Sequence, residues 1–189
     1  MKKLINWTKY HLITLSIAVL ILAAGWIVMS APDSSETTSG QTPAPRVGFL
    51  APEFSLKTIT GETIQLRELK DKVVILNLWA TWCPPCRAEM PALQRVAVDY
   101  AERGLVVLAI NMTTQDNLND VRTFVQEFQI TTPVLLDMDG SVSEKYQARA
   151  LPTTFFIGQG NIINKVVIGG PLSESLLRVE VEKLLDGVD

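Results

Sequence analysis

The chain has 189 residues, of which 47% are hydrophobic and 20% are charged, and its formal net charge at pH 7 is -3. This length suits one domain of ordinary size with extensions. The negative charge does not favour a nucleic-acid-binding protein, because such proteins usually present a basic face. With 2 cysteines, the chain cannot build the multi-disulfide scaffold of a small secreted domain.

A long apolar segment lies near the N-terminus, from Leu12 to Met29, and it contains no charged residue and no proline. A run of about 18 apolar residues is long enough to cross a bilayer. Lysines precede the segment and acidic residues follow it. Because positive charge tends to stay in the cytoplasm, we expect residues 1–11 to be cytoplasmic, residues 12–30 to form a single-pass signal-anchor helix, and the rest to lie across the membrane.

A cleaved signal peptide is the alternative for this segment. Its apolar core would be shorter, about 7–15 residues, and a small-residue cleavage site would follow. Met29-Ser30-Ala31 is a poor match to such a site, and whether the anchor is clipped after export stays open. Residues 31–46 are rich in Pro, Ser and Thr. They predict a flexible linker of roughly 20–25 Å average span, ahead of a globular domain at residues 47–189.

The globular part alternates segments typical of strands with segments typical of helices. Residues 73–80 form a nearly continuous apolar run, as in a strand buried on both faces. The alternation predicts an α/β fold with a central mixed sheet flanked by helices. In chain order we expect a hairpin around Thr60-Gly61, the strand 73–80, a helix from Pro84 to Arg103, a strand at 105–112, a helix from Asn117 to Phe128, a strand at 132–139, a short helix from Val142 to Tyr146, a hairpin across 159–161, and a helix from Ser173 to Leu185.

Both cysteines of the chain lie where the strand 73–80 passes into the predicted helix, with Cys83 just before the helix and Cys86 in its first turn. A structural zinc site needs four nitrogen or sulfur ligands, and the single histidine, His11, precedes the apolar segment. Covalent haem attachment uses C-x-x-C-H, whereas Arg87 follows the second cysteine. We therefore expect neither a metal nor another cofactor.

A redox-active pair fits this position better. Cys83 would lie at a helix N-terminus, where free backbone N–H groups and the helix dipole stabilise a thiolate, the nucleophile of disulfide exchange. Cys86, one turn further, would lie beneath it and close the disulfide. Pro84 suits the first helical turn, because its missing N–H would have no intrahelical partner there. Inert neighbouring thiols are a poor alternative outside the cytoplasm, where they oxidise.

The segment VVILNLWATWCPPCRAEMP (residues 73–91) resembles the active-site segment of the thioredoxin superfamily and, more narrowly, of the membrane-anchored TlpA/ResA-like thiol-disulfide oxidoreductases. Trp82 before the pair, Pro91 inside the helix, and Ala150-Leu151-Pro152-Thr153 before a strand carry the resemblance, which covers roughly residues 47–187. It implies a thioredoxin-like fold with an N-terminal hairpin and a strand–helix insertion between residues 105 and 136. It also implies a bacterial cell membrane protein whose catalytic domain is extracytoplasmic.

The resemblance also implies roles for single residues. Cys83 would attack a substrate disulfide, and Cys86 would resolve the mixed disulfide. The peptide bond before Pro152 would be cis, with the backbone of Leu151 available to a substrate peptide. The residues expected to contact substrate are Trp82, Pro84, Pro85, Leu151 and Pro152.

A further catalytic role falls to Glu89. Thioredoxins carry a buried Asp at the position of Asn77, where it helps to move the proton of the second cysteine, and Asn cannot ionise. Glu89, three residues after Cys86, matches a functional glutamate of the TlpA/ResA-like proteins. A carboxylate there would raise thiol pKa values and exchange protons. The alternative is a solvated helix residue, since Glu is rarely buried.

Other conspicuous residues have plainer explanations. We expect Trp79, Phe155 and Phe156 in the core, Trp82 as a ridge beside the site, and Arg87 at the surface. Peroxiredoxins share the fold, but their P-x-x-x-T-x-x-C motif would place Thr at Ala80 and Pro at Leu76. Peroxidase activity is therefore not expected.

The residues around the pair also indicate the direction of exchange. More hydrogen-bond donors aimed at the attacking cysteine make a stronger oxidant, yet both intervening residues are prolines without an N–H, and Glu89 would add negative charge. We therefore expect a reductant of disulfides in exported proteins. The resemblance implies apocytochromes c among the clients, and a membrane electron donor of the thiol-reducing type.

Two alternatives stay open. The domain could be a disulfide-forming oxidase, or a non-catalytic thioredoxin-fold binding or metallochaperone module. The intact cysteines argue against a pure binding module, and the chain lacks the extra histidines usual in metal or haem sites.

Overall fold

The structure is a computed structural model, and it describes residues 15–17, 19–20 and 42–187. The chain divides into two compact units, Met1–Thr37 and Thr38–Asp189. Residues 15–17 and 19–20 of the first unit are helical, and no helix within the described residues is long and apolar enough to cross a membrane. The predicted cytoplasmic segment, most of the predicted anchor, and the linker up to residue 41 lie outside the described residues.

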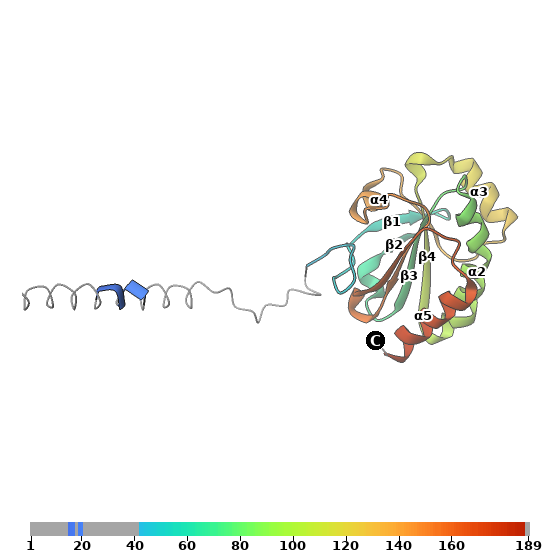
Figure 1. The fold of residues 1–189 in the computed structure, drawn as a ribbon. Coiled ribbons are helices and arrows are strands. Elements are labelled where there is room, and N and C mark those ends of the chain that lie inside the picture. The colour runs from blue at the N-terminus through green and yellow to red at the C-terminus, as the bar shows by residue number, and fades with distance from the viewer. Residues whose placement is uncertain (1–14, 18, 21–41, 188–189) are drawn as a thin grey trace, which may run out of the picture. The chain divides into compact units, whose positions relative to one another are not determined.

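A seven-stranded mixed sheet forms the middle of the second unit (Figure 1), in the order β2-β1-β5-β4-β3-β6-β7. Strands β3, β4 and β5 are parallel, whereas β6, β7 and the hairpin β1–β2 join as antiparallel neighbours. The strands are β1 Ser55–Thr58, β2 Thr63–Gln65, β3 Val73–Trp79, β4 Leu105–Asn111, β5 Val134–Leu136, β6 Thr153–Ile157 and β7 Ile163–Ile168.

The central strand, β3, is buried along its whole length. Its apolar run suits a strand covered on both faces. β3 pairs with β4 in parallel from Val73↔Leu105 to Trp79↔Asn111. Because the two strands end at the same edge of the sheet, the loops that follow them meet there. The loop after β3 ends at Cys83, and Cys86 lies in the first turn of the helix that follows.

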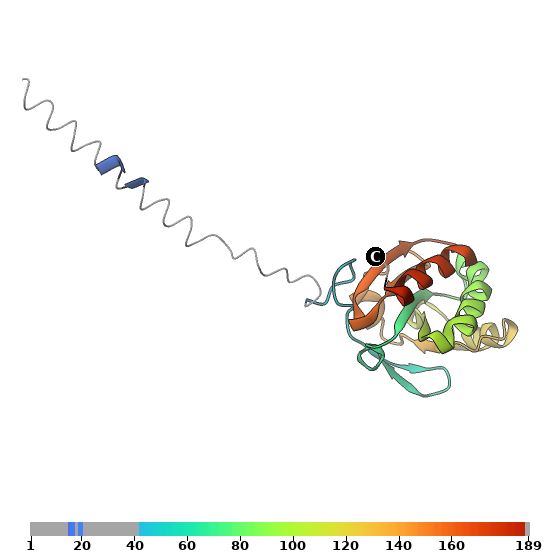
Figure 2. The same ribbon diagram turned by 90° about the horizontal axis from the view of Figure 1, so that it is seen from below.

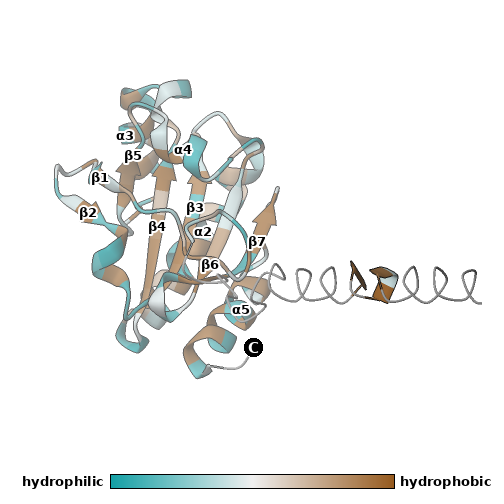
Figure 3. Cartoon of the chain, turned by 90° about the vertical axis from the view of Figure 1, so that its left-hand side faces the viewer, coloured by the Kyte–Doolittle hydropathy of each residue, from teal (hydrophilic) through white to brown (hydrophobic). Residues whose placement is uncertain are grey.

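Helices cover both faces of this sheet (Figure 2). One cluster of buried side chains joins α2, α3 and α5 to Ile75 and Trp79 of β3. A second cluster joins Leu76 and Leu78, on the opposite face, to Tyr146 and the segment before β1. The central strands carry mostly hydrophobic residues (Figure 3), which places the core on both sides of β3. The helices are α2 Pro84–Tyr100, α3 Leu118–Glu127, α4 Ser141–Lys145 and α5 Glu174–Asp186.

The predicted order of strands and helices is confirmed, with small changes at the element ends. The helix predicted to Arg103 ends at Tyr100 and continues as a 3-10 turn, and Gly104 follows with a φ of 97°. The third buried strand is shorter than predicted, because Pro133 has no N–H for the sheet. Asp137 ends it by turning its carboxylate to the backbone N–H groups of Val142 and Ser143.

Candidate active site

The cysteine pair lies directly after the central strand, at the N-terminus of α2. The backbone turns after Trp79 so that the N–H of Cys83 donates to the carbonyl of Ala80 at 3.2 Å. Cys83 is the N-cap residue of α2 and has an extended backbone, and Pro84 and Pro85 open the helix. Proline suits these positions because N–H groups of the first turn lack intrahelical acceptors. The predicted placement of Cys83 is confirmed.

A disulfide joins Cys83 to Cys86, with an S–S distance of 2.07 Å. The backbone N–H of Cys86 donates to Cys83 Sγ at 3.3 Å. Cys83 is 3% exposed and Cys86 is fully buried. Cys83 is therefore the sulfur that a substrate can reach, and Cys86 is placed to attack it from inside the protein.

A groove of about 300 Å³ opens beside Cys83. Four of the residues predicted to contact substrate line it, and Pro152 does not. Trp82 forms an exposed ridge of this groove, as predicted, with 56% of its surface accessible. The remaining lining residues, which the sequence did not indicate, are Met112, Gln115, Ala148, Arg149 and Ala150.

The peptide bond between Leu151 and Pro152 is cis, as the family resemblance implied. The carbonyl of Pro152 accepts a hydrogen bond from Gly169 at 2.7 Å, which joins this loop to the end of β7. A Cβ at Gly170 would lie 2.7 Å from both Pro152 Cγ and Glu89 Oε2. The loop after β7 therefore fills the space between Pro152 and Glu89, behind the groove.

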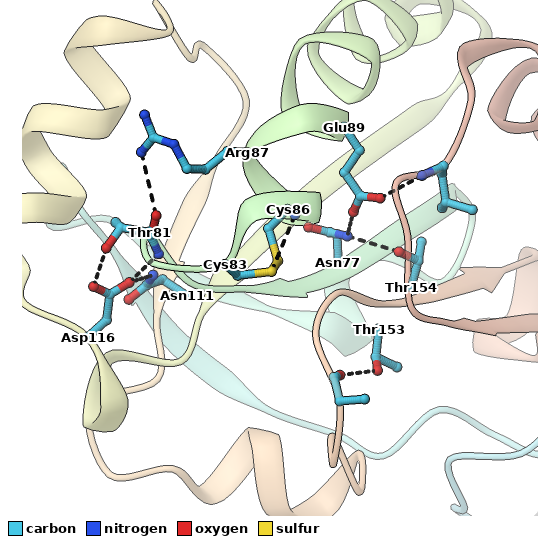
Figure 4. Close-up of a disulfide and its surroundings, with 12 residues drawn as sticks. Asn77, Thr81, Cys83, Cys86, Arg87, Glu89, Asn111, Asp116, Thr153 and Thr154 are labelled. Carbon is cyan, nitrogen blue, oxygen red and sulfur yellow. Dashed lines mark hydrogen bonds between the residues drawn. A yellow bond between two sulfur atoms is a disulfide. The ribbon is translucent and has the colours of Figure 1, made fainter.

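Glu89 lies on α2, one turn beyond Cys86, and is 1% exposed, so the alternative of a solvated helix residue is wrong. Its Oε1 accepts a hydrogen bond from Asn77 Nδ2 and its Oε2 accepts one from the backbone N–H of Leu172, each at 2.8 Å (Figure 4). Burial raises the pKa of Glu89, and the hydrogen bonds from Leu172 and Asn77 lower it by less. The carboxyl therefore keeps its proton to a higher pH than an exposed glutamate.

A second polar cluster, which was not predicted from the sequence, holds the turn in front of Cys83. Thr81 donates twice to Asp116, from its N–H at 2.6 Å and from its hydroxyl at 2.5 Å. Asn111 Nδ2 and the N–H of Asn117 also donate to this carboxylate, each at 2.8 Å. Burial raises the pKa of Asp116, but these hydrogen bonds together outweigh burial and lower the pKa below its ordinary value.

The loop after β4 also holds the ridge of the groove. The indole N–H of Trp82 donates to the carbonyl of Gln115 at 2.8 Å. One sequence feature could have indicated this contact, namely the run of polar residues that follows β4. Because β3 and β4 are parallel neighbours, that run lies at the same sheet edge as the turn before Cys83. No sequence pattern indicated which oxygen atoms would accept hydrogen bonds from Thr81 and Trp82.

The remaining predicted residues fall mostly where expected. Trp79, Phe155 and Phe156 are buried in the core. Arg87 lies at the surface, as predicted, where its guanidinium also stacks over the Phe124 ring at 4.9 Å and forms an ion pair with Glu127 at 3.4 Å. This stacking fastens the first turn of α2 to α3.

Comparison with known proteins agrees with this geometry. A model of the AhpC/TSA family matches residues 47–166. Thioredoxin-like protein YneN of Bacillus subtilis (strain 168) is 38% identical over 140 residues, which cover 74% of this chain and 78% of that protein. Thiol-disulfide oxidoreductase ResA of the same strain is 33% identical over 159 residues, which cover 84% of each chain. A crystal structure of a thiol:disulfide interchange protein of the thioredoxin family from Chlorobium tepidum TLS superposes with a TM-score of 0.66 at 29% identity, over 72% of this chain and 95% of that one.

Proposed function

This chain belongs to the AhpC/TSA thioredoxin-like family and is a thiol-disulfide oxidoreductase of the ResA type. We propose that it works as a reductant. In this proposal the Cys83–Cys86 dithiol reduces disulfides in exported proteins, apocytochromes c among them. The reaction transfers two electrons: Cys83 attacks the substrate disulfide, Cys86 attacks Cys83, and the substrate leaves with two thiols.

The direction of electron transfer is inferred from the scarcity of hydrogen-bond donors around Cys83 Sγ. An N-cap side chain usually accepts a hydrogen bond from the N–H of the second or third helical residue. Pro85 occupies the second position and has no N–H, so only the Cys86 N–H remains, at 3.3 Å. A thiolate with few donors is poorly stabilised in the reduced form, which makes the dithiol a better reductant.

The buried carboxyl of Glu89 supports the same direction. When ionised, it adds negative charge one turn from Cys86 and disfavours a thiolate there. When protonated, it can supply the proton that a departing substrate thiolate needs. The ionised state therefore destabilises the reduced pair and favours a reductant, whereas the protonated state assists release of the reduced substrate without changing the direction.

The proposed location of the redox domain is the outer side of a bacterial cell membrane. The apolar segment 12–30, with lysines before it, favours a signal-anchor helix in a bacterial cell membrane, and the domain 47–189 would then be extracytoplasmic. Since each turnover oxidises the dithiol, a membrane electron donor of the thiol-reducing type must restore it. The oxidising surroundings outside the cytoplasm cannot do so.

Trapping the clients tests this proposal. In a Cys86→Ser variant of the full chain, expressed in a bacterium, Cys83 would still attack but the mixed disulfide would persist. We expect covalent complexes with exported cysteine proteins that disappear on reduction and are absent from the Cys83→Ser control. Accumulation of the wild-type protein in its oxidised form in cells that carry a thiol-reducing membrane donor would contradict the reductant role.

A further inference from the structure

Asn77 lies in the middle of β3 and faces the helical layer that includes α2, the helix of the redox pair. Side chains alternate along a strand, and Ile75 and Trp79, on either side of Asn77, belong to the cluster that also contains Cys83 and Cys86. Asn77 is fully buried. A polar amide at this depth needs partners for its nitrogen and its oxygen.

The nitrogen of this amide has its partners, and the oxygen has none. Asn77 Nδ2 donates to Glu89 Oε1 at 2.8 Å and to Thr154 Oγ1 at 2.9 Å. Among the described residues, no donor reaches the buried Asn77 Oδ1. In Figure 4 the nitrogen end of the amide faces Thr154 and Glu89, and the oxygen end points toward Cys86. A buried acceptor without a donor is costly, so this arrangement calls for an explanation.

We propose that Asn77 Oδ1 accepts a hydrogen bond from the thiol of Cys86 when the pair is reduced, which makes Asn77 a positioning residue for the resolving cysteine. In the disulfide, Cys86 Sγ carries no hydrogen, so the acceptor is left unpaired in this state. Reduction would supply the missing donor. One amide would then hold the Cys86 thiol at its oxygen end and the Glu89 carboxylate at its nitrogen end.

The step this serves is resolution of the mixed disulfide. Cys86 Sγ attacks Cys83 Sγ, the bond between Cys83 and the substrate sulfur breaks, and the electron pair leaves with the substrate thiolate. The proton of Cys86 goes to the Glu89 carboxylate held by the same amide, and then to the departing thiolate. The proposal rests on the exchange chemistry of this site and holds for either direction of net electron flow.

The S–H stretching band tests the hydrogen bond itself. In a reduced Cys83→Ser variant of the full chain, Cys86 is the single thiol, since the chain has 2 cysteines. We expect its infrared band at lower wavenumber than in Cys83→Ser/Asn77→Leu, which lacks the acceptor. The matched control is Cys83→Ser/Thr154→Val, which removes a partner of Nδ2 but leaves Oδ1, and its band should not move. An unchanged band in the Asn77→Leu protein overturns the proposal.

The rate of resolution gives a second readout. A mixed disulfide of Cys83 with thionitrobenzoate releases its coloured thiolate when Cys86 attacks. Loss of one hydrogen bond predicts release about fivefold slower in Asn77→Leu than in the wild type, with the first attack of Cys83 on the reagent unchanged. If release keeps its wild-type rate, Asn77 does not position the thiol.

Asn77→Asp covers the case in which the leucine variant fails to fold. It keeps an oxygen toward Cys86, so the S–H band should stay at low wavenumber. It also places two carboxyls within hydrogen-bond distance, so one must hold a proton, and the pH at which release reaches half its maximum should rise. A band that moves to the unbonded position in Asn77→Asp would overturn the proposal. A reduction potential typical of oxidants would overturn only the reductant direction.

Discussion

The carboxylate of Glu89 accepts a hydrogen bond at 2.8 Å from the backbone N–H of Leu172, which lies 83 residues further along the chain. This contact fastens α2, which carries both cysteines, to the loop that connects β7 and α5. Together with the bond from Asn77, it keeps a carboxyl inside the protein one turn from Cys86. The buried acid of this site therefore depends on three distant segments of the chain.

Glu89→Gln should remove the proton acceptor of the resolving step. We expect release of thionitrobenzoate from Cys83 to slow by about a hundredfold at neutral pH, the lower end of the range for general acid–base catalysis. The dependence of release on pH should also lose the inflection that the raised pKa of Glu89 produces. Glu102→Gln, at an exposed position just after α2, is the control and should leave both unchanged. A Glu89→Gln protein that keeps the inflection would show that another group titrates.

The contribution of Glu89 to the stability of the folded protein should fall as the pH rises past the ordinary pKa of a glutamate. Burial holds the pKa of Glu89 above its unfolded value, so the folded state binds this proton more tightly and the slope of unfolding free energy with pH is negative. The contribution is complete below about pH 4 and is lost as the pH passes through the raised pKa. Urea unfolding between these limits should show a shallower decline in Glu89→Gln than in the wild type.

The two prolines can be tested separately, because only Pro85 occupies a position whose N–H would reach the side chain of the N-cap residue, Cys83. Pro85→Ala restores an N–H at the second helical residue, where it can donate to Cys83 Sγ. A charge-assisted bond of about 1.5–3 kcal/mol corresponds to a potential about 30–60 mV less negative. Pro84→Ala restores an N–H at the first helical residue, which does not reach the cap side chain, so its potential should stay near the wild-type value. Equal shifts in the two variants would contradict this explanation.

The cluster at Asp116 should stabilise the turn before Cys83. Thr81→Val removes the hydroxyl that donates to the carboxylate, and we expect a loss of about 1–2 kcal/mol in the free energy of unfolding. Thr81→Ser keeps the hydroxyl and should lose less than half as much. Urea titration of both variants measures the difference. Equal losses in the two variants would mean that the methyl group contributes as much as the hydrogen bond, which would contradict this account.

Gly170 should not tolerate a side chain. A Cβ there would lie 2.7 Å from Glu89 Oε2 and from Pro152 Cγ, so Gly170→Ala must displace the loop or both partners. We expect a loss of about 1–3 kcal/mol of stability, typical of overpacking, together with slower release from Cys83. Gly160→Ala, at a turn with open space but a φ of 73°, controls for a glycine replacement that carries only backbone strain. A stable, fully active Gly170→Ala protein would contradict the packing described.

Much of the fold could be predicted because the signals are local. The apolar run of β3, the N-cap residues Asn117 and Ser173, and the stop at Gly104 each act within a few residues. The alternation of strands and helices then predicted an α/β fold, in which helices pack on a central sheet. The burial of β3 followed from its composition alone.

The polar contacts of the site were harder to predict, because they join residues that are far apart in sequence. Glu89 was predicted to matter, but its partner Leu172 donates from the backbone, which leaves no mark in the side-chain pattern. The meeting of Thr81 with Asp116 depends on two loops whose conformations are set by the sheet edge. A hydrogen bond across 35 residues has no periodicity to reveal it.

The central claim is that this dithiol is a reductant, and its reduction potential tests that claim most directly. The full chain would be equilibrated with dithiol buffers of known potential, and the fraction of the Cys83–Cys86 disulfide measured by thiol alkylation. We predict a value near that of thioredoxin, about -270 mV. A value near about -120 mV, as in strongly oxidising enzymes, would contradict the account and make the protein a disulfide-forming oxidase.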